Sequence, residues 1–421
     1  MKVFKNFLNR FSGEKDLATT IRNSGYYFGS SVVGIAVSFV TFPLYAILLT
    51  KEQFGILAFF SAIGNVLTPF SILSLTNYYI VRSGELSGDE KKALFNDLVL
   101  FNLMWNSVLI LTGGGILYLY LELSAGSVEF FPNALLMFLI LITQSFITFK
   151  SVQYRMDRSG LRFFLLQILQ VLGNAVLGLS IVWIFNAGAT GKLIGIAISN
   201  IVAAVTFGHE TITNFIRIDM ARVKKGLLEM KELTIASFLH STVPSADVLV
   251  LERYNNLTGL GEYSVGKQIA NFVGMAGSSL FQAFEPKIYE DTRHNGFWRS
   301  KNFIVFFGLN ILLLLLYFAF SDLIIAILTA GRFQTSLQYS NLLVFQAFNS
   351  SIIQALQIKL YVERKVKLIA ILNVLGSALT FILIFPLTSD LLYQGAAISF
   401  LIASIFQLLL TLILMMYNGK S

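Results

Sequence analysis

Residues 302–320 read NFIVFFGLNILLLLLYFAF, nineteen residues in a row without a charged side chain. An apolar helix of roughly 20 residues is what crosses the hydrocarbon core of a bilayer. Eleven further runs of mostly apolar residues follow one another along the chain. The sequence therefore predicts an all-α polytopic membrane protein with twelve transmembrane helices and no soluble domain.

The least apolar of the twelve runs carries His240, Pro244 and Asp247. The approximate limits of the runs are 26–49, 54–80, 94–121, 132–149, 163–185, 193–213, 233–251, 261–284, 302–320, 337–359, 368–387 and 391–417. If the weak run 233–251 did not span the membrane, the last five spans would have the opposite orientation.

Composition excludes a soluble class for this chain. Only 13% of the 421 residues are charged and 55% are apolar, whereas soluble domains carry about 25% charged residues. The mean hydropathy is +0.71. The chain has no cysteine, which excludes disulfides and thiolate metal sites.

The basic residues are distributed unevenly between the predicted loops. With the N-terminus inside, the two ends and the loops after even-numbered spans hold 26 of the 31 Lys and Arg residues. The outer turns hold Lys51, Lys192, Arg253 and Arg332, and Lys267 lies within a span. Cytoplasmic loops collect basic residues, so both termini are predicted to be cytoplasmic. The same distribution explains the net charge of +8 by topology and lipid headgroups, and no nucleic-acid partner is expected.

The loop after the sixth span divides the chain into two halves. Ile216, Met220, Val223 and Leu227 recur there at helical spacing between charged residues, which predicts an amphipathic helix on the inner leaflet. We expect an N-terminal six-helix bundle at 1–213, a cytoplasmic amphipathic linker at 214–232 and a C-terminal six-helix bundle at 233–421. Weak similarity between KEQFGI at 51–56 and GEYSVG at 261–266 supports two pseudo-symmetric halves.

Two opposite charges lie within the predicted spans seven and eight. Asp247 is ten residues before position 257 and Lys267 is ten residues after it. A hairpin that turns there places both at one depth, and charges within a membrane face a partner or a cavity. Three interpretations stay open: a static ion pair, a cationic contact for an anionic substrate with Asp247 tuning it or taking a proton, or two side chains that face different ways.

The tenth span has a stripe of polar residues. Gln346, Asn349, Ser350, Gln354 and Gln357 fall within one arc of about 140° on a helix. Hydrogen bonds between helices explain a few such residues, but five favour a water-filled cavity. Side-chain amides both donate and accept hydrogen bonds, so this cavity would suit sugar hydroxyls.

Arg22 and Arg82 border the inner ends of the first two spans. Each either anchors its helix to lipid headgroups or contacts an anionic headgroup at a cytoplasmic gate. Catalytic motifs are absent. The stretch Gly188–Lys192 resembles a phosphate-binding loop, but Asn186 stands where the full pattern needs glycine. No metal site or cofactor is expected.

Three stretches of the chain resemble the Wzx-type polysaccharide flippases, which belong to the superfamily that includes MATE drug exporters and the lipid II flippase MurJ. They are IRNSG at 21–25, LTKEQFG at 49–55, and the eighth span, which begins GEYSVGKQIA at 261–270 and ends FEPKIY at 284–289. The resemblance implies two helical bundles around a central cavity and alternating access. It also implies that Arg22, Arg82, Asp247 and Lys267 lie on helices of the portal and lumen.

The function expected from this resemblance is that of a flippase in the cytoplasmic (inner) membrane. Its cargo would be an undecaprenyl-pyrophosphate-linked oligosaccharide, moved from the cytoplasmic to the outer leaflet by a proton or sodium gradient or the membrane potential. Membrane lipids and the polysaccharide polymerase machinery are the other expected partners. The candidate substrate-binding residues are Lys267, Asp247, Arg22, Arg82, Gln346, Asn349, Gln354 and Gln357. Two alternatives stay open: a MATE-like cation-coupled exporter of small molecules, and a membrane-embedded glycan polymerase or ligase.

Overall fold

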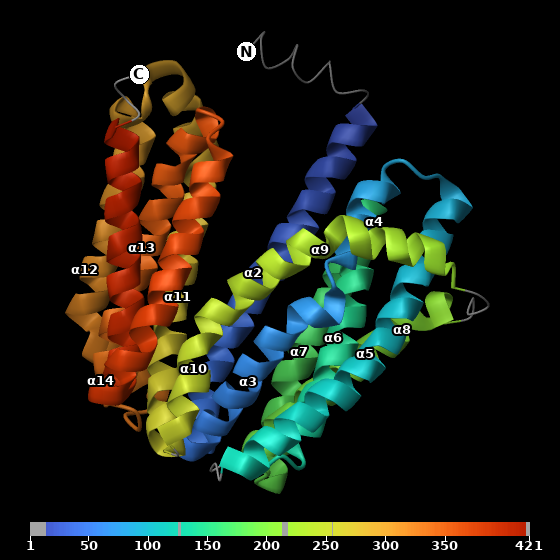
Figure 1. Cartoon of the computed structure of the whole chain (residues 1–421), viewed down its shortest axis with the longest axis horizontal. Helices are drawn as coiled ribbons and strands as arrows, with labels where there is room; N and C mark the ends of the chain where they lie inside the picture. Colours follow the sequence, from blue (N-terminus) through green and yellow to red (C-terminus); the bar gives the residue numbers. More distant parts are fainter. Residues whose placement is uncertain (1–13, 125–127, 213–217, 255, 418–421) are drawn as a thin grey trace. The chain divides into compact units, whose positions relative to one another are not determined.

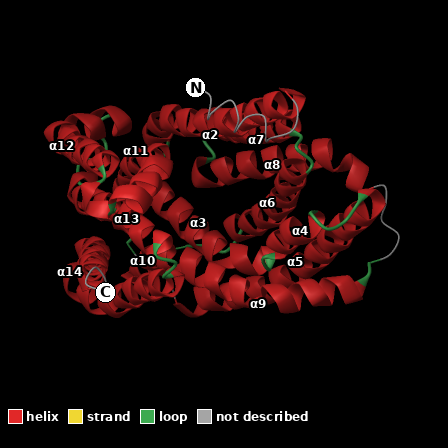
Figure 2. Cartoon of the chain, turned by 90° about the horizontal axis from the view of Figure 1, so that it is seen from above, coloured by secondary structure: helices red, strands yellow, loops and turns green. Residues whose placement is uncertain are grey.

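The computed structural model describes residues 14–124, 128–212, 218–254 and 256–417. In these residues all the regular structure is helical and there is no strand (Figure 2). The expected all-α fold is therefore confirmed. The chain divides into two compact units, of which unit 1 comprises Met1–Leu48 and Ile63–Thr242, and unit 2 comprises Leu49–Ala62 and Val243–Ser421.

Unit 1 is a bundle of helices, most of them long enough to cross a membrane (Figure 1). Its helices are α2 (Glu14–Leu48), the second part of α3 (Lys51–Ile72), α4 (Leu75–Ser83), α5 (Gly88–Ser124), α6 (Asn133–Met156), α7 (Gly160–Phe185), α8 (Gly188–Ile212) and α9 (Met220–Thr242). Helix α7 packs against α2 and α8, and α6 also packs against α8. The start of α3, up to Ala62, belongs to unit 2.

Unit 2 has the long helix α11 at its centre. Its helices are α10 (Ala246–Leu251), α11 (Leu257–Asn295), α12 (Lys301–Thr329), α13 (Ser336–Val362) and α14 (Val366–Tyr417), with 3-10 turns at Val243–Ser245, Glu252–Tyr254 and Phe297–Arg299. Helix α11 packs against α12 and α13, and α13 packs against α14. The short helix α10 packs against α14.

Each of the twelve predicted spans corresponds to helical structure, but the helices are not divided as predicted. The second span covers α3 and α4, and the seventh covers the end of α9, a 3-10 turn and α10. Within the part of the chain that the structure describes, nine helical stretches are long and apolar enough to cross a membrane. They correspond to the first seven predicted spans, of which the second extends beyond Ile72, to the ninth, and to the last two together in α14. The backbone of α14 leaves helical conformation at Leu392, where φ is 50° and ψ is −125°, which separates the last two spans. The predicted spans eight and ten are α11 and α13, whose polar side chains lower their hydropathy.

The expected boundary between a linker helix and the seventh span is not present. Helix α9 runs without a break from Met220 to Thr242, because no residue near position 232 interrupts a helix. The break comes instead at Val243–Ser245, where Pro244 has no N–H to donate. Residues 214–217 of the expected linker lie outside the described residues.

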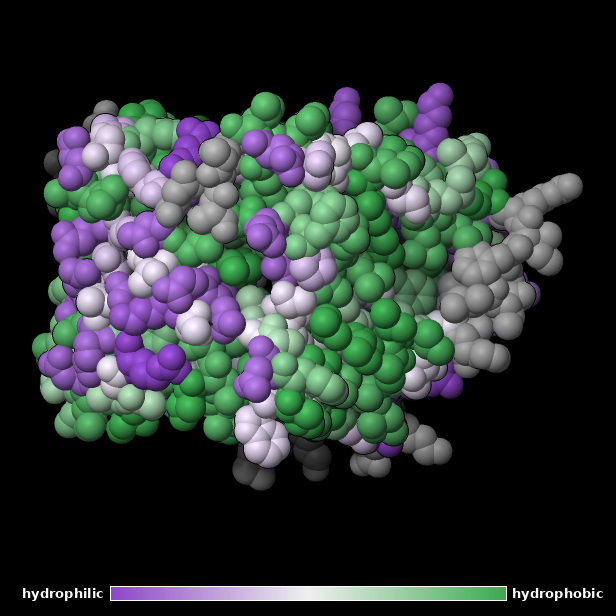
Figure 3. Space-filling view, turned by 90° about the horizontal axis from the view of Figure 1, so that it is seen from below, coloured by the Kyte–Doolittle hydropathy of each residue, from purple (hydrophilic) through white to green (hydrophobic). Residues whose placement is uncertain are grey.

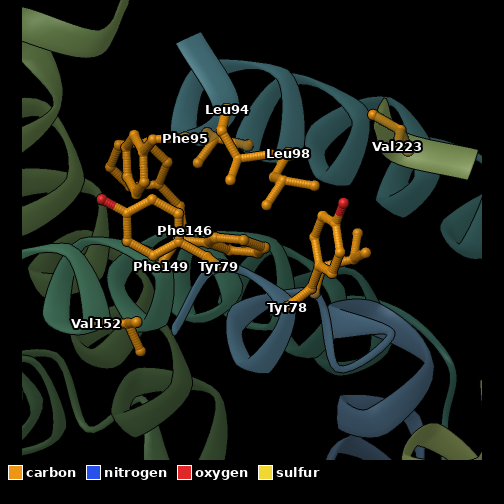
Figure 4. Packing of buried hydrophobic residues seen from close by; sticks show 11 residues of the cluster. Tyr78, Tyr79, Leu94, Phe95, Leu98, Phe146, Phe149, Val152 and Val223 are labelled. Atoms are coloured by element: carbon orange, nitrogen blue, oxygen red, sulfur yellow. The ribbon is translucent and has the colours of Figure 1, made fainter. Parts of the chain in front are cut away.

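An aromatic cluster holds α9 to unit 1. Tyr78 and Tyr79 of α4 pack with residues of α5 and α6 and with Val223 of α9 (Figure 4). Elsewhere, large apolar side chains such as Leu111, Trp183 and Ile327 are exposed, and hydrophobic residues cover much of the face drawn in Figure 3. An exposed apolar surface of this extent is what a helix bundle presents to lipid rather than to water.

Candidate functional site

The break at Pro244 positions Asp247 against helix α11. The 3-10 turn at Val243–Ser245 is followed by α10, and Asp247 in its first turn is completely buried. The Asp247 carboxylate accepts a hydrogen bond from its neighbouring Val248 N–H at 2.8 Å. A buried carboxylate of this kind requires further partners, because an unpaired charge away from water is costly.

Lys267 of α11 supplies the opposite charge. Its Nζ lies 2.6 Å from Asp247 Oδ2 and 2.8 Å from Oδ1, and it also donates to the Pro244 carbonyl oxygen. The side chain of Lys267 is 23% exposed. The two charges therefore face each other, as an ion pair or a coupled transport site requires, and the interpretation in which they face apart is wrong.

Tyr263 completes the surroundings of the carboxylate. Its hydroxyl donates to Asp247 Oδ2 at 2.6 Å, one helical turn before Lys267. The ring of Tyr263 is fully buried and lies against Tyr339 and Tyr393, at centroid distances of 5.6 and 6.4 Å. Asp247 is thus held by an ammonium, a phenol and a backbone amide, all within unit 2.

Lys267 also faces a polar pocket inside unit 2, with a volume of about 250 Å³. The wall is formed by the 3-10 turn before α10, by α11, by α13 and by both parts of α14. Its polar side chains are Lys267, Asn271, Gln346, Ser350, Ser377, Thr380, Ser404 and Gln407. Lys267 Nζ lies 5.6 Å from the centre of the Phe400 ring, which also lines the pocket.

The polar stripe of α13 divides between the pocket and neighbouring helices. Gln346 and Ser350 line the pocket and are joined by a 3.1 Å hydrogen bond. Asn349 and Gln357 are buried and donate to Ser404 and Asn373 of α14, at 3.0 and 3.2 Å. Gln354 is exposed and does not line the pocket. The structure thus brings Gln346 together with Lys267 and assigns Asn349 and Gln357 to hydrogen bonds between helices.

Arg82 and Arg22 belong to unit 1. Arg82 pairs with Glu85 at 2.7 Å and with Glu229 of α9 at 2.8 Å. The hydrogen bonds that Arg82 donates to Glu85 and then to Glu229 raise the pKa of its guanidinium. Two carboxylates therefore neutralise Arg82, while Arg22 is exposed on α2. Anchoring and contact with an anionic headgroup both remain hypotheses for these residues.

A family model described as "Polysaccharide biosynthesis protein" matches residues 20–290. The chain belongs to this family. Among solved structures, the lipid II flippase MurJ in an inward closed conformation is similar at 14% identity, with 95% of this chain and 88% of that chain covered and a TM-score of 0.75.

Two MATE structures are similar too. The multidrug transporter DinF-BH is 17% identical over 95% of this chain and 94% of its own, with a TM-score of 0.57. An inward-facing multidrug resistance MATE transporter of the MOP superfamily is 14% identical over 95% of this chain and 96% of its own, with a TM-score of 0.54. Comparison with curated proteins gives no match. The resemblance expected from the sequence is confirmed: this polysaccharide biosynthesis family member is a membrane protein with the fold that MurJ and MATE transporters share.

Other polar clusters of this family member are structural. In unit 1, Gln170 of α7 donates to Gln144 of α6 and, at 3.2 Å, to Asn200 of α8, so this amide joins α7 to both neighbouring helices. At the start of α8, Lys192 Nζ lies 4.2 Å from the centre of the Tyr45 ring. The stretch that resembled a phosphate-binding loop is thus the beginning of a helix. The described residues contain no cluster of three metal-ligating His, Cys, Asp or Glu side chains.

Besides Asn271 of α11, four polar pocket residues were not predicted from the sequence: Ser377, Thr380, Ser404 and Gln407, all on α14. They form two pairs at a spacing of three residues, which places each pair on one helix face. That spacing is a weak signal, because hydroxyls in spans also bond to their own helix, as Thr380 does to the Gly376 carbonyl oxygen at 3.0 Å. The spacing becomes informative only with the structure, in which Gln346 and Ser350 of α13 line the same pocket as these four residues.

Proposed function

We propose that this protein is a flippase that moves a lipid-linked oligosaccharide from the cytoplasmic to the outer leaflet by alternating access. The polar pocket of unit 2 carries this proposal. Ionisable and polar side chains within membrane helices are expensive, and they mark substrate or ion pathways. Here they gather around one cavity, next to the only described lysine that lies deep in a predicted span.

The chemistry of the pocket suits a sugar. Gln346, Gln407 and Asn271 each offer a carbonyl oxygen and an NH₂ group, while Ser350 and Ser377 offer hydroxyls. A sugar hydroxyl is also a donor and an acceptor, so each can bond to either group. Drug-sized ligands occupy cavities of roughly 300–1,000 Å³, so this smaller pocket accommodates one sugar unit and not the whole cargo.

The cargo proposed is an undecaprenyl-pyrophosphate-linked oligosaccharide, a polysaccharide repeat unit. Transport needs no covalent step by the protein, and an ion gradient of protons or sodium, or the membrane potential, drives the cycle in the absence of a nucleotide-binding motif. The protein lies in the inner membrane with both termini cytoplasmic, surrounded by lipids. It passes its product to the polysaccharide polymerase machinery.

A MATE-like exporter of small cations is the second candidate, since MATE transporters share the fold. An organic cation would require a carboxylate that is available to it. Asp247, the buried carboxylate of this site, is already bound by Lys267 and Tyr263. This arrangement favours the glycan over the cation.

Reconstitution tests the proposal. Proteoliposomes containing a fluorescent undecaprenyl-pyrophosphate oligosaccharide are assayed for transfer between leaflets, with and without a proton or sodium gradient. We expect gradient-dependent transfer. Absence of transfer, together with gradient-driven movement of a small organic cation, would contradict the flippase and support the exporter.

A matched pair of variants connects transfer to the pocket. Ser350 lines the pocket, whereas its neighbour Ser351 faces away and bonds to the Gly277 carbonyl oxygen and Asn310, at 3.3 and 3.2 Å. Gln346→Leu and Ser350→Ala should slow transfer, and Ser351→Ala should not. An equal loss in both serine variants would indicate an effect on folding instead of on the pocket.

A further inference from the structure

We propose that the pocket of unit 2 accepts an uncharged sugar unit, and that Lys267 is part of a neutral ion pair in its wall instead of a receptor for an anion. This inference rests on the proposed function and adds the substrate class. It differs from the expectation that the single deep lysine binds an anionic group of the cargo.

The hydrogen bonds of Lys267 are the first argument. An ammonium group has three hydrogens and no acceptor. Two of its contacts go to the Asp247 carboxylate and a third goes to the Pro244 carbonyl oxygen. These three contacts use its donors, so no N–H is left for an anion in the pocket.

The burial of Asp247 is the second argument. Its side chain has no exposure, whereas that of Lys267 is 23% exposed. If an incoming anion drew Lys267 away, a fully buried carboxylate would lose its counter-charge, and breaking a buried pair in this way is strongly unfavourable. Tyr263 and the Val248 N–H also hold the carboxylate in place. The pair is therefore neutral as a whole and resists rearrangement.

The rest of the pocket wall is the third argument. Among the described residues that line it, Lys267 is the only one with a charge. The others are amides, hydroxyls and apolar groups, and the Phe400 ring covers part of the lysine at 5.6 Å. An acidic sugar or a phosphate would enter without a free cation to meet it, whereas an uncharged sugar would meet the donors and acceptors of the uncharged polar side chains.

Two fluorescent undecaprenyl-pyrophosphate oligosaccharides of equal length test this inference. One contains only uncharged hexoses, and the other has a hexuronic acid in place of each hexose. In proteoliposomes with the wild type, the uncharged cargo should cross at least about tenfold faster, as expected when a pocket discriminates by polar mismatch. Equal or faster transfer of the acidic cargo would overturn the inference. Transfer of neither cargo would overturn the proposed function itself.

Changing the counter-charge gives a second test with the same two lipids. Asp247→Asn keeps the shape of the side chain and leaves Lys267 with its charge uncompensated, so the preference should shift toward the acidic cargo by about tenfold or more. In Lys267→Gln/Asp247→Asn the preference for the uncharged cargo should return. If Lys267→Gln instead abolishes transfer of an acidic cargo that the wild type moves well, Lys267 is an anion receptor and the inference is wrong. The wild-type comparison remains decisive if a variant does not fold.

Discussion

Gly55 and Gly261 face each other where the start of α3 meets the start of α11 in unit 2. A Cβ atom added to Gly261 would lie 1.8 Å from the Lys51 carbonyl oxygen, and one added to Gly55 would lie 2.4 Å from the Leu257 carbonyl oxygen. Nearby, Lys51 Nζ lies 2.5 Å from Glu262 Oε1. The two stretches with similar sequences, 51–56 and 261–266, thus pack directly against each other.

This close approach predicts a specific sensitivity to alanine. Gly261→Ala should lower the free energy of unfolding by about 1–3 kcal/mol, the usual cost of overpacking, because the three atoms nearest to the new methyl group are all backbone atoms. Gly308→Ala in α12 is the matched control, since nothing lies within 4 Å of its added Cβ. Thermal unfolding in detergent measures both, and equal melting temperatures would contradict the close contact.

The sequence predicts the parts of the fold that depend on apolar length. Residues 302–320 lie within α12. The spacing of Asp247 and Lys267 about position 257 predicts that both lie at one depth, and in the structure they form an ion pair. The sequence does not predict which polar side chains line the pocket, because that depends on helices that are distant in sequence. A helical arc gives the direction of Gln346 and Gln354 but not their surroundings, so only the structure separates the residue in the pocket from the exposed one.

The break in the second span shows the same limit. The sequence predicts one span over 54–80, but α3 ends at Ile72 and α4 begins at Leu75. Leu73 and Ser74 between them have φ values of 51° and 52°. Neither residue is typical of such a conformation, which favours glycine. Side chains of α5, more than thirty residues further along the chain, donate to the Phe70 and Ser71 carbonyl oxygens just before this break. No local sequence pattern reveals such contacts.

Substitutions of Lys267 should separate charge from packing. Lys267→Ala leaves Asp247 buried without its counter-charge, which costs about 3–5 kcal/mol of stability, and transport should fall while membrane insertion is retained. Lys267→Arg should retain much of the activity. The double variant Lys267→Met/Asp247→Leu should unfold at a higher temperature than Lys267→Ala. If the double variant melts at the same temperature as Lys267→Ala, the loss of stability does not come from the unpaired charge of Asp247.

Asp291 gives a prediction about pH. Hydrogen bonds from Ser300 Oγ at 2.7 Å and Asn302 Nδ2 at 2.9 Å lower the pKa of the Asp291 carboxyl group. A carboxyl group with a lowered native pKa stabilises the fold above its unfolded pKa of about 3.9 and loses that contribution as the pH falls through the native value. Asp291→Asn should therefore melt slightly below the wild type at pH 7. The difference should shrink below pH 4, and a difference that grows in acid would contradict this assignment.

The break between α3 and α4 predicts a stabilising substitution. A residue other than glycine with left-handed backbone angles costs roughly 1–2 kcal/mol of conformational energy. The Ser74 side chain makes no capping hydrogen bond that would offset this cost. Ser74→Gly should therefore raise the melting temperature. The free energy of unfolding should rise by up to about 1 kcal/mol, because glycine also increases the entropy of the unfolded chain, which offsets part of the relieved strain.

Removing the α5 side chains that hydrogen-bond to the backbone before this break should instead lower the melting temperature. Asn102 Nδ2 donates to the Ser71 carbonyl oxygen at 2.5 Å, and Trp105 Nε1 donates to the Phe70 carbonyl oxygen at 2.7 Å. Asn102→Leu would leave a buried carbonyl oxygen with fewer donors, at a cost of about 1–3 kcal/mol, so it should lower the melting temperature. If Asn102→Leu were instead neutral and Ser74→Gly destabilising, the break would be maintained by the local backbone and not by α5.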